Sequence, residues 1–347
     1  MSEHSKVRVV QAGCGNMSAA WIEPALKIPQ LQYVGLVDPN LENARKTAAR
    51  FGLPESIIFS SLGDALEKTR PDVVFDVTVP AAHYEITMQA LRFGCHVLGE
   101  KPMSDTLENA RQMVAAARDA GKIYAVIQNR RYEPNVQRVR EFLETGAIGT
   151  PHTIHADFFL GPHFGGFRDL MAQPLLVDMA IHTFDAARYL AALDPVNVYC
   201  KSFNPVGSWF AGDACAIAIF DMKNADGNPV VFCYRGSWCA EGLPTSWQAC
   251  WRIIGDKGTL LWNGEDEIRV EVAGDSSSDF MRPAREISVP PKTVEHTHHA
   301  ALIREFISCF QNGGVPQTRA ADNIKSLAMV LGAVESADTG KTMAISD

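Results

Sequence analysis

In the first part of the chain, short apolar runs alternate with stretches that have the spacing of amphipathic helices. The runs expected to form strands are residues 7–12, 31–37, 73–78, 96–98 and 123–127, and the helices between them start near Ala19 and include 41–51, 64–68, 82–93 and 107–119. Strands that are apolar throughout are typical of a parallel sheet covered by helices on both faces. The pattern therefore predicts an α/β fold with a doubly wound, Rossmann-type domain over residues 1–127.

From about residue 150 the pattern changes, because strand-like runs follow one another with few helices between them. These runs are 151–159, 196–203, 214–220, 229–236, 247–254, 258–262 and 268–272. The succession predicts a second, α+β domain over residues 128–347 with a large, open, mostly antiparallel sheet. Two helices, at about 297–311 and 322–338, close the chain and are candidates for packing back on the first domain.

Two of these second-domain strands carry apolar residues on both faces. In the run 247–254, Trp251 lies on one face and Ile254 on the other, and the run 214–220 is also apolar on both. A sheet with helices on one side should have a polar second face. We therefore expect a homodimer or homotetramer through this sheet, with Trp251 at the interface. The alternative is that loops of the same domain cover the open face.

Composition narrows the class of protein. The 347 residues suit two domains, and 46% hydrophobic and 21% charged residues are ordinary for a globular protein. The net charge is −8 without a basic stripe, so neither nucleic acid nor an anionic membrane is an expected partner. The polar start and the lack of a spanning apolar run favour the cytoplasm. The eight cysteines form no CxxC pair and are expected to be reduced, and we expect no metal site, including at Glu295–His299.

A glycine-rich turn follows the first predicted strand. Gly13 permits a tight turn, Gly15 lets the backbone approach a pyrophosphate, and Ser18 replaces a third glycine. Asp38 ends the next strand, 20 residues after Ser18, where a carboxylate meets the ribose hydroxyls of a dinucleotide. A carboxylate there repels a 2′-phosphate, so NAD is expected rather than NADP. The alternative for Asp38 is a cap on the helix 41–51.

A second candidate feature lies on a predicted helix that runs from Leu176 to Arg188. Asp178 and His182 are four residues apart and share a helix face, and Asp185 lies close to the same stripe. A carboxylate that orients an imidazole is the recurring form of a general base. The alternative is that these polar residues form a solvated helix face.

Polar residues also gather where the predicted parallel strands end. They include Thr78 to Pro80, Gly99 to Pro102 and Gln128 to Arg131. Ligands bind beyond the carboxyl ends of strands in such sheets, so one site is expected there. Lys101 could hold a substrate oxygen beside a nicotinamide. An exposed loop lysine is the alternative, and the Lys101–Pro102 bond is a candidate for the cis form.

Taken together, these motifs resemble the Gfo/Idh/MocA family of oxidoreductases over nearly the whole chain. The resemblance rests on the turn from Gly13 to Met17, on Val77 to Pro80 with His83, on Gly99 to Pro102, on Asn129 to Tyr132, on Asp178 to Asp185 and on the closing run from Ser336 to Lys341. The family often has consecutive glycines shortly before the Asp178 position. Residues 171–176 of this chain have none, which puts the substrate in doubt.

The resemblance implies roles for individual residues. Lys101, Asp178 and His182 match the catalytic set. Cofactor contacts are implied for the loop and strand-end residues Gly13, Gly15, Asn16, Met17, Asp38, Thr78, Pro80, His83, Glu100 and Lys101. Substrate contacts are implied for Arg130 and Asp185, with His155 and Asp157 as looser candidates.

The expected activity is NAD-dependent oxidation of a secondary hydroxyl of a sugar, cyclitol or sugar derivative. One alternative is an NAD-dependent glycosidase that works through a transient keto sugar. A second is a sensor that binds NAD and sugar without turnover.

Overall fold

The computed structural model describes residues 6–274, 280 and 282–346. It divides into two compact units. The first consists of residues 1–129 and 296–324, and the second of residues 130–295 and 325–347. The segment 296–324 thus belongs to the first unit although it follows the second in sequence, and the return to the second unit falls inside α9 (Ala320–Thr339).

The first unit is built on a parallel sheet of six strands among the described residues, in the order β3-β2-β1-β4-β5-β6. The strands are β1 (Val7–Ala12), β2 (Leu31–Val37), β3 (Ile58–Phe59), β4 (Val73–Asp76), β5 (His96–Gly99) and β6 (Tyr124–Val126). The helices are α1 (Ser18–Ala25), α2 (Leu41–Phe51), α3 (Leu62–Thr69), α4 (Pro80–Phe93), α5 (Leu107–Asp119) and α8 (His298–Asn312). The order reverses between β1 and β4, which confirms the predicted doubly wound sheet.

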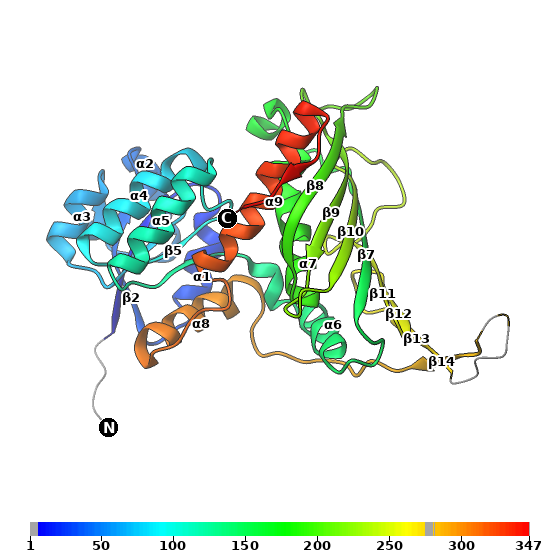
Figure 1. Cartoon of the computed structure of the whole chain (residues 1–347). Coiled ribbons are helices and arrows are strands. Elements are labelled where there is room, and N and C mark those ends of the chain that lie inside the picture. Colours follow the sequence, from blue (N-terminus) through cyan, green and yellow to red (C-terminus); the bar gives the residue numbers. More distant parts are fainter. Residues whose placement is uncertain (1–5, 275–279, 281, 347) are drawn as a thin grey trace. The chain divides into compact units, whose positions relative to one another are not determined.

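The second unit holds a sheet of nine strands within the described ranges, in the order β14-β13-β12-β11-β7-β10-β9-β8-β15 (Figure 1). The strands are β7 (Pro151–Phe159), β8 (Asp194–Phe203), β9 (Cys215–Lys223), β10 (Pro229–Ser237), β11 (Cys250–Gly255), β12 (Gly258–Trp262), β13 (Ile268–Ala273), β14 (Ala284–Ile287) and β15 (Met343–Ala344). Neighbours are antiparallel except for β7 and β10, which run parallel. The mostly antiparallel sheet confirms the expected α+β domain.

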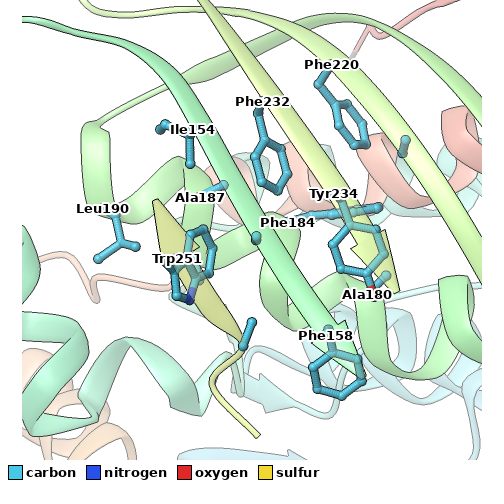
Figure 2. Packing of buried hydrophobic residues seen from close by; sticks show 14 of the residues in the cluster. Ile154, Phe158, Ala180, Phe184, Ala187, Leu190, Phe220, Phe232, Tyr234 and Trp251 are labelled. Atoms are coloured by element: carbon cyan, nitrogen blue, oxygen red, sulfur yellow. The ribbon is translucent and has the colours of Figure 1, made fainter. Parts of the chain in front are cut away.

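One face of this sheet packs on helices α6 (Pro134–Glu144) and α7 (Ile181–Ala191). Figure 2 shows Phe184 of α7 among the buried rings of the sheet, with centroids 4.7 Å from Phe220 and 5.1 Å from Tyr234. Strand alternation sends every second residue to this face, which is where the core of the unit lies.

Trp251 belongs to this core, so its expected place at an interface is wrong. Its side chain is 3% exposed and stacks against Phe232 and Trp262. The register pairs Trp251 with Ala156 of β7, whose side chain is also buried in the core of this unit. A residue and its cross-strand partner lie on the same face of a sheet. The pairing with Ala156 therefore places the Trp251 side chain on the face that the helices cover.

The opposite face of the sheet, which we call the open face, carries an apolar patch on β8, β9 and β10. The patch consists of Tyr199 on β8, Ile217 and Ile219 on β9 and Val231 on β10, all exposed large hydrophobic side chains on neighbouring strands. The two isoleucines confirm that the run 214–220 is apolar on both faces. Exposed apolar patches of this kind mark interaction surfaces.

The helix expected over residues 176–188 begins differently from the prediction. Its first six residues, Leu175–Ala180, form a π-helical turn, and α7 continues from Ile181. Single π-helical turns inside α-helices are rare and are frequently found at functional sites. Asp178 lies in this turn and His182 in the first turn of α7.

Three further features of the described residues concern cysteines, metal ligands and membrane-spanning helices. All eight cysteines are free. No group of three or more His, Cys, Asp or Glu side chains in the described part of the chain could hold a metal ion. None of the described helices is both long and apolar enough to cross a membrane.

Candidate active site

The turn between β1 and α1 is shaped so that only glycine fits its first position. Gly13 has φ +95°, and a Cβ there would lie 2.3 Å from the Val77 carbonyl oxygen. A Cβ on Gly15 would meet no atom within 4 Å, so the space above this residue is open. The turn leads into the N-terminus of α1, which has no acidic residue in its first turn. Open space at the positive end of a helix dipole suits an anion such as a pyrophosphate.

Asp38 lies at the end of β2 and is tied to the same turn. Its Oδ2 accepts a hydrogen bond from the Cys14 N–H at 3.0 Å, and its Oδ1 accepts one from the Asn40 N–H at 2.9 Å. The cap of α2 is Asn40, whose side chain accepts from the Glu42 N–H, so the alternative reading of Asp38 as the cap is wrong. Burial and the nearby Asp38 carboxylate raise the pKa of the Cys14 thiol to about 12.

Beyond β4, a buried carboxylate organises the start of α4. Asp76 accepts hydrogen bonds from the Thr78 hydroxyl at 2.6 Å and from the Thr87 hydroxyl at 3.2 Å, and its Oδ1 lies 3.0 Å from His83 Nδ1. His83 is buried with Asp76, so its ring lies beneath the surface and supports Thr78. A buried His83 would act on the cofactor through Thr78 instead of contacting it directly. Thr78 and Pro80 themselves lie nearer the surface.

Glu100 and Lys101 follow the end of β5. The Glu100 carboxylate accepts from Trp21 Nε1 at 2.8 Å and from the Lys101 N–H at 3.1 Å, and His299 Nε2 lies 3.9 Å away. Burial alone would raise the pKa of Glu100, but the interactions with His299, Trp21 and Lys101 lower it below its usual value. Glu100 is thus held as an anion. The Lys101–Pro102 bond is cis, as the sequence suggested.

His299 was missed as a site residue. It lies at the start of α8, within the helix expected at about 297–311, and 199 residues after Glu100. No local spacing could connect the two, because α8 reaches Glu100 only through the return of residues 296–324 to the first unit.

In the second unit, His182 and Asp178 stand at the start of a buried helix. All residues of α7 from Ile181 to Leu190 are buried, so the alternative of a solvated face is wrong. Asp178 Oδ2 accepts from Arg168 Nε at 2.7 Å, and both side chains are partly screened from solvent. Arg168 lies in a short 3₁₀ turn, Gly166–Leu170, and was not identified from the sequence because the loop has no periodic pattern.

Asp185 faces a different environment from Asp178. Its carboxylate accepts from Arg131 Nε at 2.7 Å and from Arg131 Nη2 at 2.6 Å, and from the Ser326 hydroxyl at 2.7 Å. Arg188 Nη1 lies 3.9 Å away. Both members of the Arg131–Asp185 pair are buried. Both oxygen atoms of the buried Asp185 carboxylate are engaged by side chains of the same unit, so its role is structural. This arrangement argues against the substrate contact implied for Asp185.

The looser candidates His155 and Asp157 lie on the wrong side of the sheet. In β7 the side chains of Ile154, Ala156 and Phe158 point to the helices, so His155 and Asp157 point to the open face. Asp157 forms a bidentate ion pair with Arg235 across the strands, at 2.7 and 2.5 Å. Neither residue lies on the face that α7 covers, where His182 is found. The substrate contacts implied for His155 and Asp157 therefore do not fit this site.

Arg130 remains a candidate. Its guanidinium lies 6.0 Å from the Phe158 ring centroid, on the helix side of the sheet, and donates to the Trp247 carbonyl oxygen. Burial lowers the pKa of Arg130 to about 10, with Tyr234 and Glu133 acting in the opposite direction. The side chain therefore stays charged near neutral pH.

The fold and these residues define an NAD-binding oxidoreductase. Residues 7–128 match a family model described as an oxidoreductase family with an NAD-binding Rossmann fold, and residues 136–261 match the GFO/IDH/MocA C-terminal domain. The chain belongs to the Gfo/Idh/MocA family, which confirms the resemblance seen in the sequence. The open space at Gly15, the α1 N-terminus and the Asp38 carboxylate fit the pyrophosphate and ribose of NAD.

Individual relatives are similar over almost their full length. The chain is 28% identical to a D-apiose dehydrogenase of Paraburkholderia graminis over 95% of this chain and 88% of the relative. Its fold matches an oxidoreductase from Agrobacterium radiobacter, solved with NAD+, L-tartaric acid and magnesium, at a TM-score of 0.85 and 21% identity over 98% and 99% of the chains. It also matches levoglucosan dehydrogenase, solved with NADH and levoglucosan, at 0.81 and 22% over 99% and 100%.

Proposed function

We propose that this enzyme oxidises a secondary hydroxyl of a sugar, cyclitol or sugar derivative to a ketone. The observation that carries the proposal is the buried start of α7, where His182 follows an Asp178 carboxylate held by Arg168. An imidazole in such surroundings can accept a proton from an alcohol. The activities in the names of D-apiose dehydrogenase and levoglucosan dehydrogenase support a sugar-like substrate.

The residues divide the work as follows. NAD, when bound, accepts the hydride from the carbinol carbon at its nicotinamide C4. The Gly13–Gly15 turn and Asp38 hold the cofactor, and Lys101 donates to the substrate oxygen. His182 takes the hydroxyl proton as the C–O bond becomes a carbonyl, and the Asp178 carboxylate stabilises the imidazolium that results. One proton and one hydride leave the alcohol, so the reaction balances.

The test is a screen of sugars, cyclitols and glycosides with the purified chain and NAD+, followed by NADH absorbance and product analysis. A ketone formed with one NADH per turnover is expected. Release of an aglycone without net NADH would identify a glycosidase instead. Tight binding of NAD and sugar with no product of either kind would identify a sensor.

Cofactor choice is expected to depend on Asp38. Replacing Asp38 with Ala removes a carboxylate that repels a 2′-phosphate, so the preference for NAD over NADP should shrink by about tenfold, or ~1.4 kcal/mol. Calorimetric titration of both cofactors measures this. Arg45→Ala, a change on the surface of α2, serves as a comparison. Tighter binding of NADP than of NAD by the unaltered chain would contradict the role of Asp38.

We also infer that the chain assembles through the open face. Ile217 and Ile219 are exposed near the middle of β9, the third strand from one edge of the sheet, and exposed apolar side chains are unfavourable in water unless another surface covers them. Ile217→Lys with Ile219→Lys should therefore lower the mass measured by light scattering to that of a monomer. Val206→Lys, in an exposed loop, should leave the mass unchanged. A monomeric wild type at micromolar concentration would remove the inference.

A further inference from the structure

Three large aromatic side chains of the second unit are left exposed next to the candidate site. Phe164 is 57% exposed, Phe167 65% and Trp247 45%, and we call these three residues the aromatic shelf. Phe164 and Trp247 have ring centroids 6.4 Å apart, and both pack on the buried Trp238, at 6.2 and 6.0 Å. Exposed aromatic rings that lie close together would gain free energy if a ligand removed them from water. Patches of this kind therefore indicate a binding surface.

The aromatic shelf is continuous with the Asp178 carboxylate. Arg168 donates from Nε to Asp178 at 2.7 Å, and the same guanidinium lies 5.6 Å from the Phe164 centroid and 4.8 Å from the Phe167 centroid. The width of one guanidinium therefore separates the carboxylate beside the proposed base from the exposed rings. A ligand that contacts Asp178 therefore has Phe164 and Phe167 within the span of one additional ring.

The loops that carry the aromatic shelf are anchored rather than free. Thr245 and Phe159 are joined by a backbone hydrogen bond of 2.9 Å, and the Ala240 N–H donates to the Leu160 oxygen at 3.0 Å. His163 Nε2 lies 3.0 Å from Glu241 Oε1, and the Trp247 carbonyl accepts from Arg130. These contacts tie the Phe164 loop to the Trp247 loop. A surface fixed before binding loses little entropy when a ligand arrives.

We propose that the aromatic shelf binds a second ring of the substrate, so that the chain acts on glycosides in preference to free monosaccharides. This rests on the proposed function of His182. A flat aromatic face stacks on the C–H face of a sugar ring or on a planar aglycone, whereas the charged Arg168 and Asp178 meet hydroxyl groups. A monosaccharide with its reacting hydroxyl at His182 would leave the aromatic shelf uncovered.

The proposal also restricts the position that is oxidised. In a glycoside the anomeric oxygen is bonded to the second ring and carries no hydroxyl. The hydroxyl that His182 deprotonates must then be a secondary hydroxyl elsewhere on the first ring, and the product is a keto glycoside with the glycosidic bond intact.

The experiment compares matched substrates on the full chain. For each of several sugar epimers, the free sugar, the methyl glycoside, the phenyl glycoside and the corresponding disaccharide are assayed for NADH formation. Binding of the same compounds is measured by calorimetry in the presence of NADH, so that affinity is read without turnover. The variants are Trp247→Ala, Phe164→Ala and the conservative Trp247→Phe, with Phe280→Ala as an exposed phenylalanine between β13 and β14.

We expect wild type to bind and oxidise the phenyl glycoside or disaccharide roughly tenfold better than the methyl glycoside, since stacking on an aromatic face is worth about that factor. Trp247→Ala should abolish this difference, Trp247→Phe should restore most of it, and Phe280→Ala should not affect it. Equal affinity of wild type for methyl and phenyl glycosides would contradict the binding of a second ring by the aromatic shelf. It would not contradict the proposed oxidation. Ring-dependent binding without any NADH formation would contradict the proposed function and not the aromatic shelf.

Discussion

Replacing His182 with Asn should lower kcat by roughly 100- to 10,000-fold, the usual cost of losing a general base. The imidazole lies at the buried start of α7, so bulk water is poorly placed to accept the proton instead. NAD affinity should hardly change, because the glycine turn and Asp38 belong to the first unit. Stopped-flow NADH formation and calorimetric NAD titration separate the two effects.

Lys101→Met gives the companion measurement. The substitution keeps the length of the side chain and removes its positive charge. That charge interacts more strongly with the alkoxide that develops in the transition state than with the neutral hydroxyl of the bound substrate, so kcat should fall in this variant too. Both residues act on one proton transfer, and the double variant should be much less impaired than the product of the two single losses. The rate should rise with pH as the base loses its proton, and this limb should vanish in His182→Asn. Values of kcat within about threefold of wild type in both single variants would contradict the assignment.

The first unit could be predicted closely because its signals are local. Five of the parallel strands are mostly apolar runs of three to seven residues, which a short sequence window detects, whereas the two-residue β3 was not predicted. Gly13 and Asp38 follow directly after two of these strands, β1 and β2. The site residues that were missed, Arg168 and His299, lie in a loop and at a helix start. Their partners, Asp178 and Glu100, are brought to them by tertiary structure that no short window contains.

Trp251 shows the limit of strand alternation. The pattern correctly places Trp251 and Ile253 on one face, but which face the helices cover depends on the pairing of β11 with β7. Apolar residues occur on both faces of β11, with Ile254 opposite Trp251, so composition does not decide the face of Trp251. β7 is different, because the polar His155 and Asp157 alternate with buried apolar residues, and this alternation already indicates the open face for both.

Asp185 shows a second limit, that of a polar residue whose partners are remote in sequence. Helical spacing placed it near the stripe of Asp178 and His182, which suggested a substrate contact. Its partners are Arg131, 54 residues earlier, and Ser326, 141 residues later. Both oxygen atoms of the carboxylate are engaged by these buried groups, so the side chain has a structural role that only the folded unit reveals.

We therefore expect Asp185→Ala to lower the free energy of unfolding by about 3–5 kcal/mol, because it leaves the buried Arg131 charge without its partner. Glu144→Ala is the matched control. The Glu144 carboxylate also accepts from an arginine, Arg140, but it is exposed at the end of α6. Exposed pairs contribute about 0–1 kcal/mol, so this loss should be small.

Denaturant unfolding of the two variants and wild type measures the difference directly, with m-values compared to confirm that the same unit unfolds. Both pairs join an arginine Nε to a carboxylate oxygen at 2.7 Å, so a large difference between the variants isolates burial as the cause. If Asp185→Ala unfolds at the denaturant concentration of wild type but raises KM for a genuine substrate, the carboxylate is a substrate ligand after all, and its pairing with Arg131 must open when substrate binds.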